Sequence, residues 1–139
     1  MNDNNKTYIA MYFYFDIWGT PHYTNPYIAM EDEPKPIDKK YYGNNYVLYS
    51  PYSHKIMGNN PTVLQKHIKH LAFNNVKKLN NQIQFLEAFL ENLTEEEFCL
   101  REQYQASLNT FKRILKENYN IYKILSEQLK TFSFINNEK

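Results

Sequence analysis

The chain has 139 residues and a formal net charge of +1, which is the length of one domain and gives no overall attraction to nucleic acid or membranes. Hydrophobic residues make up 42% and charged residues 22%, which excludes a disordered chain, and the single cysteine excludes an internal disulfide. The longest apolar run, residues 8–18, is shorter than the roughly 20 residues of a membrane-spanning helix. The first residues do not resemble a signal peptide, so the sequence predicts a soluble, cytoplasmic protein.

Alternating side chains predict a first β-strand over residues 8–18. One face is apolar and is expected to be buried, and it consists of Ile9, Met11, Phe13, Phe15 and Ile17. The other face is expected to be half exposed, and it consists of Tyr8, Ala10, Tyr12, Tyr14, Asp16 and Trp18. Gly19 and Pro21 are expected to end the strand, because glycine permits a turn and proline cannot donate to a ladder.

Shorter strands are predicted over the following residues. Residues 23–30 are a candidate strand that is weakened by Pro26, and residues 31–40 are predicted to be a charged loop. Residues 46–49 and residues 55–57 are predicted to be two further strands. The sequence therefore predicts a small, aromatic-rich antiparallel sheet of about two to four strands.

A break at Gly58–Pro61 separates this part from a helical part. We therefore divide the chain into a β-rich region, residues 1–60, and a helical hairpin, residues 61–139, which together are expected to form one compact unit. The predicted fold class is α+β.

Two long helices are predicted in the second half of the chain. Pro61 suits the first turn of a helix, where its missing N–H costs nothing. Beyond it, apolar side chains recur at steps of four and three, which is the heptad seam of a helix that faces a partner helix. We expect the helices over about residues 62–92 and about residues 95–134, joined by a short connection as an antiparallel, coiled-coil-like hairpin.

The connection between the helices has the strongest local pattern. Thr94 and Glu97 have the spacing of a capping box, and Leu93 and Phe98 occupy the two positions of a hydrophobic staple. A single unbroken helix is the alternative, since no glycine or proline interrupts the pattern. The capping box and the staple favour the turn.

Both helices carry apolar residues beside the seam, and two isolated helices cannot cover them. These residues are Leu64, Leu71, Phe85 and Phe89 in the first helix and Ile114 and Ile121 in the second. The sheet, a second copy of the hairpin or a foreign partner must therefore pack on them. Asn118 lies in the seam itself, where it is either a buried, paired group that sets the register or, as we favour, a residue at a wet edge.

A non-enzymatic protein that binds another protein is the leading functional hypothesis. Exposed aromatic and uncovered apolar residues are suited to interfaces. The predicted contact residues are Tyr12, Tyr14, Trp18, Phe85, Phe89, Ile114 and Ile121. A second copy in a homodimer is the favoured partner, and a foreign protein is the alternative. The size and composition also fit a small accessory protein of a virus or mobile element that binds and inhibits a host factor.

The charges along the helices support a second hypothesis, the binding of nucleic acid. Residues 61–86 contain four lysines and no acid (+4), residues 87–104 six glutamates and one arginine (−5), and residues 105–139 six basic and three acidic residues (+3). The hairpin is therefore predicted to be acidic at its tip and basic along its base, where it can bind phosphates. The candidate contacts are Lys66, Lys77, Lys78, Lys112 and Arg113. An ordinary solvated helix surface is the simpler interpretation.

Few residues argue for catalysis. A third hypothesis, a small enzyme with a histidine in a tyrosine-rich pocket, requires His22 or His54 to meet a carboxylate such as Asp16. His67 and His70 have a spacing that can share a metal, but neighbouring lysines oppose a cation, so we expect both on the surface. The sequence contains no phosphate loop, nucleophile elbow or zinc motif, and we predict no metal, no cofactor and no enzymatic activity.

Overall fold

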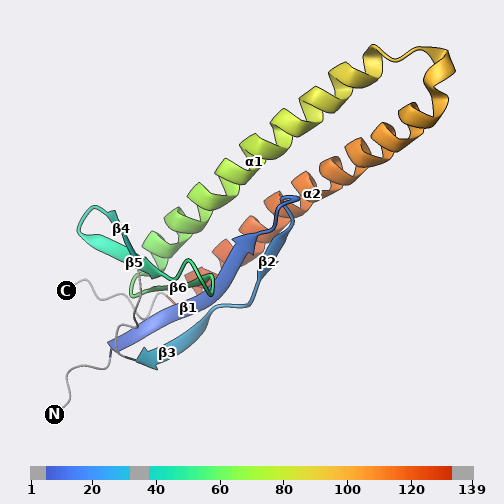
Figure 1. Ribbon diagram of the computed structural model, residues 1–139. Coiled ribbons are helices and arrows are strands. Elements are labelled where there is room, and N and C mark those ends of the chain that lie inside the picture. Colours follow the sequence, from blue (N-terminus) through green and yellow to red (C-terminus); the bar gives the residue numbers. More distant parts are fainter. Residues whose placement is uncertain (1–5, 32–37, 133–139) are drawn as a thin grey trace.

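An antiparallel sheet packs against the base of two long helices that lie side by side (Figure 1). The computed structural model describes residues 6–31 and 38–132. The sheet comes first in the chain and the two helices follow, so the predicted α+β class is confirmed. No helix in these described ranges is both long enough and apolar enough to cross a bilayer.

Six strands form the described sheet, more than the two to four that we expected. They are β1 (Lys6–Phe15), β2 (Pro21–Tyr23), β3 (Tyr27–Glu31), β4 (Asp38–Tyr42), β5 (Asn45–Tyr49) and β6 (Lys55–Gly58). Their order is β2-β1-β6-β5-β4, and β3 also pairs with β1. Within the candidate strand over residues 23–30, only residues 27–30 form a continuous strand, as part of β3, while Tyr23 ends β2 and Pro26 lies in the break between them.

Strand β4 was not predicted, because its residues fall at the end of the segment expected to be a charged loop. It pairs with β5 along its whole length, and Gly43, with a φ of 70°, makes the turn between them. The strand lies at the edge of the sheet and begins with three exposed polar residues, Asp38, Lys39 and Lys40. Lysines are common on edge strands, where they oppose pairing with another chain. Residues 32–37 of the expected loop lie outside the described residues.

Strand β1 is buried on both faces over part of its length. Ile9, Met11 and Phe13 are buried toward the helices, as predicted. Tyr8 and Ala10 were expected to be half exposed, but they are buried on the opposite face in a second cluster that includes Leu48 and Met57. Ile17, which was expected to be buried, is exposed, because β1 ends at Phe15 and the chain turns there.

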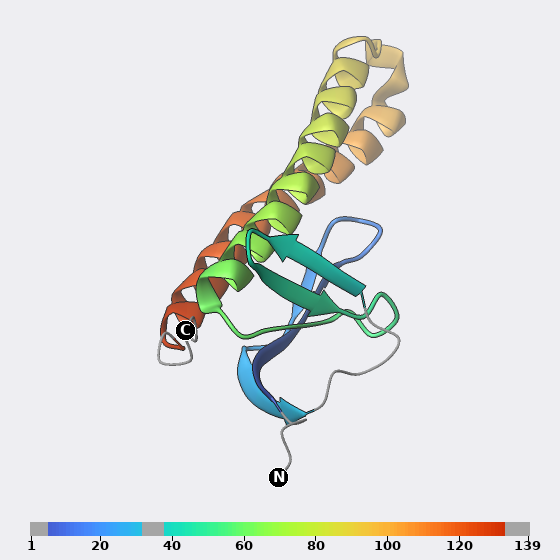
Figure 2. The same cartoon turned by 90° about the vertical axis from the view of Figure 1, so that its left-hand side faces the viewer.

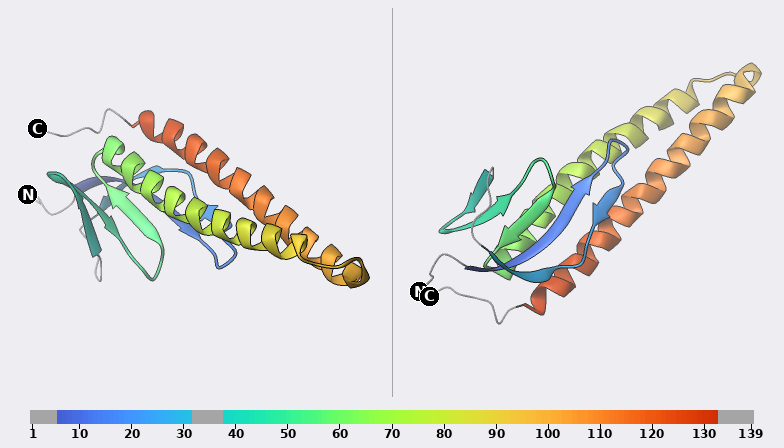
Figure 3. Two further views of the ribbon diagram at one scale, coloured as in Figure 1. Left: turned by 90° about the horizontal axis from the view of Figure 1, so that it is seen from above. Right: turned by 60° about the horizontal axis from the view of Figure 1, so that its bottom comes forward.

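The two helices and their turn lie close to the predicted positions. Helix α1 (Pro61–Glu91) is followed by a single 3-10 turn, η1 (Glu95–Glu97), and by helix α2 (Phe98–Lys130). The helices run in opposite directions along each other (Figure 3), which excludes the single unbroken helix. Residues 133–134, expected at the end of the second helix, lie outside the described residues.

The turn between the helices contains the predicted capping box. The Thr94 N–H donates to Glu97 Oε1 at 2.8 Å. Hydrogen bonds from the backbone and side chain of Thr94 hold the pKa of Glu97 below its usual value. Arg101, which sequence analysis did not single out, donates to the carbonyls of Leu90 at 3.3 Å and Leu93 at 2.8 Å. Arg101 thereby ties the start of α2 to the last turn of α1 and to the connection that follows it.

The sheet covers only the base of the helix pair (Figure 2). Buried residues of both layers form this core, including Ile9, Met11, Val47, Ile56, Leu64, Ile68, Leu125 and Leu129. Leu71 and Ile121 pack against the same core, so the sheet covers the additional apolar residues at the base. Farther out, the described helices pack on each other through Ile83, Leu86, Leu90 and Leu108 and project beyond the sheet.

Two buried asparagines join the turn after β1 to both helices. Asn75 Nδ2 lies 2.9 Å from Asn118 Oδ1 and 2.9 Å from the Gly19 carbonyl oxygen. Asn118 Nδ2 donates to the same carbonyl at 3.2 Å. Asn118 is 2% exposed, so the expected wet edge is wrong and the paired alternative holds. Gly19 has a φ of 88°, and a Cβ there would lie 2.8 Å from Leu79 Cδ2, so this position requires glycine.

Candidate functional site

A cleft of about 1120 Å³ lies between the turn after β1 and the middle of α1. It is lined by residues 13–19, by residues 49–51 with His54 and Ile56, and by residues of α1 between His67 and Gln82. Lys40 of β4 and Phe111 of α2 complete the lining. This volume is slightly larger than the range of about 300–1,000 Å³ that small-molecule sites occupy.

Asp16 is held in place by its own turn. Its Oδ1 accepts hydrogen bonds from the N–H groups of Trp18 at 2.9 Å and Thr20 at 3.0 Å, and its Oδ2 lies 2.9 Å from His22 Nε2. The hydrogen bond with His22 and those from the backbone hold the pKa of Asp16 below its usual value. The carboxylate is therefore ionised at neutral pH, and both of its oxygens already have partners.

Tyr14 is stacked between two histidine rings. The ring centroids of Tyr14 and His22 are 4.9 Å apart, and those of Tyr14 and His54 are 4.2 Å apart, with nearly parallel planes. His54 has a φ of 62° and is the only residue other than glycine with a positive φ among the described residues. Its backbone is fixed by bonds to Ser50 and Phe13. The chain thus holds an imidazole at the rim of the cleft in a conformation that favours glycine.

The histidine–carboxylate contact that an enzyme would require is present in part. His22 meets Asp16, and Asp16 and His54 line the cleft, but His22 is not among the lining residues. Such a pair can hold a proton and orient an imidazole. Within the described chain, no hydroxyl or thiol group is hydrogen bonded to this pair. The pair therefore lacks the adjacent nucleophile that covalent hydrolases use.

His67 lines the cleft and is 6% exposed, so the expectation that it lies on the surface is wrong. Its Nδ1 is 2.7 Å from the hydroxyl oxygen of Tyr42. Burial, and then the positive charges of His70 and Lys40, lower the pKa of His67 from 6.5 to about 4. His67 is therefore neutral at pH 7. Across residues 6–31 and 38–132, no group of three His, Cys, Asp or Glu residues is placed to hold a metal ion.

The buried His67 predicts a loss of stability in mild acid. The unfolded chain binds a proton on His67 near pH 6.5, whereas the folded chain does so only near pH 4. The free energy of unfolding is thus expected to fall as the pH drops from 6.5 to 4, by about 3 kcal/mol in total. Urea denaturation at pH 7, 6 and 5 measures this slope. His67→Gln should flatten it in this range, and an unchanged slope in that variant would contradict the assignment.

The residues predicted to contact a partner lie in different surroundings. Tyr12 and Tyr14 are partly exposed on β1, and Trp18 is 61% exposed in the turn that follows. Ile114 is 3% exposed, and Ile121 packs against the core under the sheet. Ile114 therefore offers no surface to a partner, and Ile121 is partly covered within the chain.

The projecting part of the helix pair carries a row of three aromatic rings. The centroids of Phe85 and Phe89 are 6.3 Å apart, and those of Phe89 and Tyr104 are 4.6 Å apart, so the row crosses from α1 to α2. Phe85 is 64% exposed, while Phe89 and Tyr104 are partly buried. We call Phe85, Phe89 and Tyr104 the aromatic strip. Tyr104 was not among the predicted contact residues.

The five basic residues predicted for nucleic-acid binding are all exposed. Lys112 lies 3.5 Å from Glu87, and Arg113 lies 3.1 Å from Glu117, so both are partly neutralised. Of the five, only Lys78 lines the cleft. Binding along the outer face of the helices stays a prediction. The basic residues Lys40 and His54 of the cleft were not combined with Lys78 by sequence reasoning, because the three lie on separate elements.

No family model, curated protein or solved structure matches this chain, so its function must be inferred from its own residues.

Proposed function

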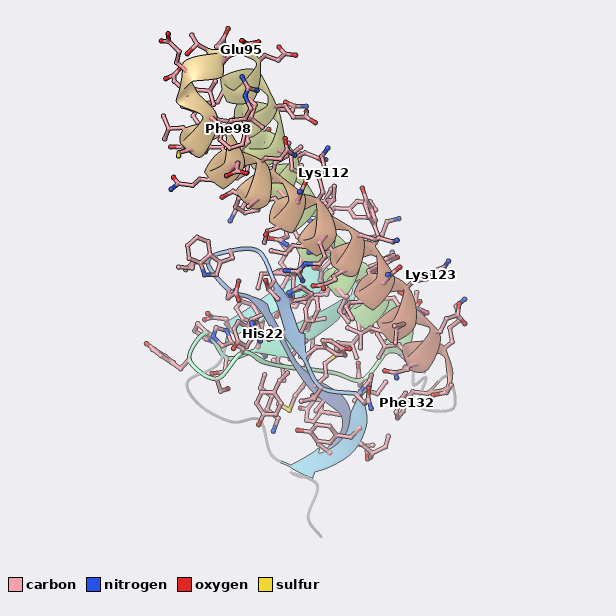
Figure 4. The ribbon with its side chains drawn as sticks, turned by 90° about the vertical axis from the view of Figure 1, so that its right-hand side faces the viewer. His22, Glu95, Phe98, Lys112, Lys123 and Phe132 are labelled. Carbon is pink, nitrogen blue, oxygen red and sulfur yellow. The ribbon has the colours of Figure 1, made fainter. Side chains whose placement is uncertain are left out.

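We propose that this protein is a non-enzymatic interaction protein that binds a protein partner through the projecting part of its helix pair. The observation that carries the proposal is the aromatic strip, which lies beyond the sheet and includes the largely exposed Phe85. Burial of such side chains releases roughly 25 cal/mol per Å² of apolar surface, and aromatic residues are enriched at interfaces. The exposed Phe98 lies near the same end of the molecule (Figure 4), and the exposed Leu100 follows it in the first turn of α2.

Charge favours a second copy as the partner. The tip carries six glutamates over residues 87–104. Basic residues lie farther from the turn on the same helices, and they are Lys77, Lys78, Lys112 and Arg113. Two copies that cross antiparallel at their strips place the acidic tip of each beside the basic residues of the other. A parallel crossing places acid against acid. An isologous, antiparallel dimer is therefore the arrangement that we propose, with the helices packed in the coiled-coil manner predicted from the heptads.

Phe85→Ser tests this interface. The substitution is expected to change the stability of the folded chain by less than about 0.5 kcal/mol, because the side chain is mostly exposed. It should weaken dimerisation by about tenfold or more, since the ring lies in the proposed contact. Light scattering over a concentration series measures the association.

Phe73→Ser supplies the control, because Phe73 is a partly exposed phenylalanine nearer the base of α1. This variant should dimerise as the natural chain does. A natural chain that stays monomeric would contradict the second copy as partner, and an equal effect of the two variants would contradict the strip as the contact.

A foreign partner is the other form of the proposal. An accessory protein of a virus or mobile element would use the same strip to bind and inhibit a host factor in the cytoplasm. The acidic tip requires a basic surface around an apolar centre on that factor. A chain that is monomeric and binds such a protein, and whose Phe85→Ser variant no longer binds it, would show that the partner is foreign.

A further inference from the structure

The residues that line the cleft include two lysines and one carboxylate, so positive charge is in excess. Lys40 reaches the cleft from β4 and Lys78 from α1, and neither forms an ion pair within the described chain. Asp16 is the only acid among the lining residues, and its oxygens already accept bonds from its own turn and from His22. The cleft is therefore suited to an anion.

Flat rings and free amides line the same cleft. Trp18 is largely exposed in the turn after β1, and Tyr49 and Phe111 also line the cleft. Asn81 and Gln82 are exposed on α1 and make no side-chain hydrogen bond within the described residues. Aromatic faces stack on nucleobases, and amide side chains donate to and accept from base edges.

The backbone at His54 gives a separate indication that the cleft has a use. A glycine would adopt this left-handed conformation without the steric cost of a side chain, roughly 1–2 kcal/mol. Residues held in such conformations cluster at functional sites. The imidazole of His54 is stacked on Tyr14 and lines the cleft, where its ring nitrogens can donate to an oxyanion.

We propose that this cleft binds a nucleotide unit, with the phosphate against Lys40 and Lys78 and the base against Trp18. A bare anion would leave the rings and amides unused, and an apolar ligand would leave the lysines unpaired. A nucleotide uses both kinds of group. The unit is either a free nucleotide or part of a single strand, since both present the same chemistry. The site shares α1 and α2 with the aromatic strip but contains none of the strip's three residues. Because the proposed dimer also places Lys78 near an acidic tip, nucleotide binding is measured in Phe85→Ser as well as in the natural chain.

The single tryptophan makes the cleft directly observable, because Trp18 is the only one in the chain. We would titrate the full chain with AMP, UMP, adenosine, ribose 5-phosphate and a short single-stranded oligonucleotide. Saturable quenching is expected with a nucleotide or with the oligonucleotide. Adenosine and ribose 5-phosphate should bind about tenfold or more weakly, because each lacks one half of the contacts. Tighter binding of the mononucleotides identifies a free ligand, and tighter binding of the oligonucleotide identifies a strand.

Lys77 and Lys78 form a matched pair, since both are exposed neighbours on α1 and only Lys78 lines the cleft. Lys78→Gln should weaken binding by about tenfold, and Lys77→Gln by no more than about twofold. Circular dichroism checks that both variants fold. The absence of saturable binding by every nucleotide and by the oligonucleotide would overturn the proposal. Equal loss in the two variants would also overturn it, because it would indicate non-specific attraction to charge.

Discussion

Asn118→Ala is expected to lower the free energy of unfolding by about 2–3 kcal/mol, which is a large effect for a polar residue. The substitution removes the bond that Asn118 donates to the Gly19 carbonyl and the oxygen that accepts from Asn75. The Asn75 amide then stays buried with one acceptor fewer. Urea denaturation followed by circular dichroism measures the loss.

Asn120→Ala is the matched control, because Asn120 is an exposed asparagine on the same helix. It should change stability by less than about 0.5 kcal/mol. Asn75→Ala and the double variant complete a cycle, in which a coupling of about 1 kcal/mol is expected for residues in direct contact. Additive losses would show that the two amides do not act as a pair.

Ile68→Ala is expected to cost about 2–5 kcal/mol, because it opens a cavity in the core between the sheet and both helices. Ile68 has no exposed surface and lies among core residues from β1, β5, β6 and α2. Removing its side chain therefore weakens the contact of the sheet with the helix pair. Lys69→Ala, at the exposed neighbouring position, should have little effect.

The same variant tests whether residues 1–60 and 61–139 unfold as one unit. Far-ultraviolet circular dichroism follows the helices, and near-ultraviolet signals follow Trp18 and the tyrosines, ten of which precede residue 53. Both transitions should move together to lower temperature in Ile68→Ala. Helices that stay folded while the aromatic signal is lost would show two separate units.

The helices were predictable because their ends depend on neighbours in the chain. Pro61 at the start of α1 and the Thr94–Glu97 capping box act within one turn of helix, so a sequence pattern identifies them directly. The alternation in β1 likewise identified the face that packs on the helices.

Long-range contacts account for what the pattern missed. Asn118 is paired with a residue 43 positions away and with a carbonyl 99 positions away, so nothing nearby distinguishes it from a wet edge. His67 is buried because Tyr42 and the sheet lie over it. The edge strand β4 is polar and forms by pairing with β5. The alternation of hydrophobic residues does not predict such a strand.

By itself, the sequence determined the α+β class, the two helices, their turn and the opposite charges of the tip and the base of the hairpin. Only the tertiary structure decided which apolar residues beside the seam are covered. Leu64 is buried in the core between the sheet and the helices, and Ile114 is also buried. Phe85 lies beyond the sheet and stays exposed. The cleft was likewise decided by tertiary structure, because Lys40, His54 and Lys78 come from elements that meet only when the sheet packs on α1. The periodicity of the sequence indicates which residues tend to be buried. The area of the helices that the sheet covers determines which of them are buried in the folded chain.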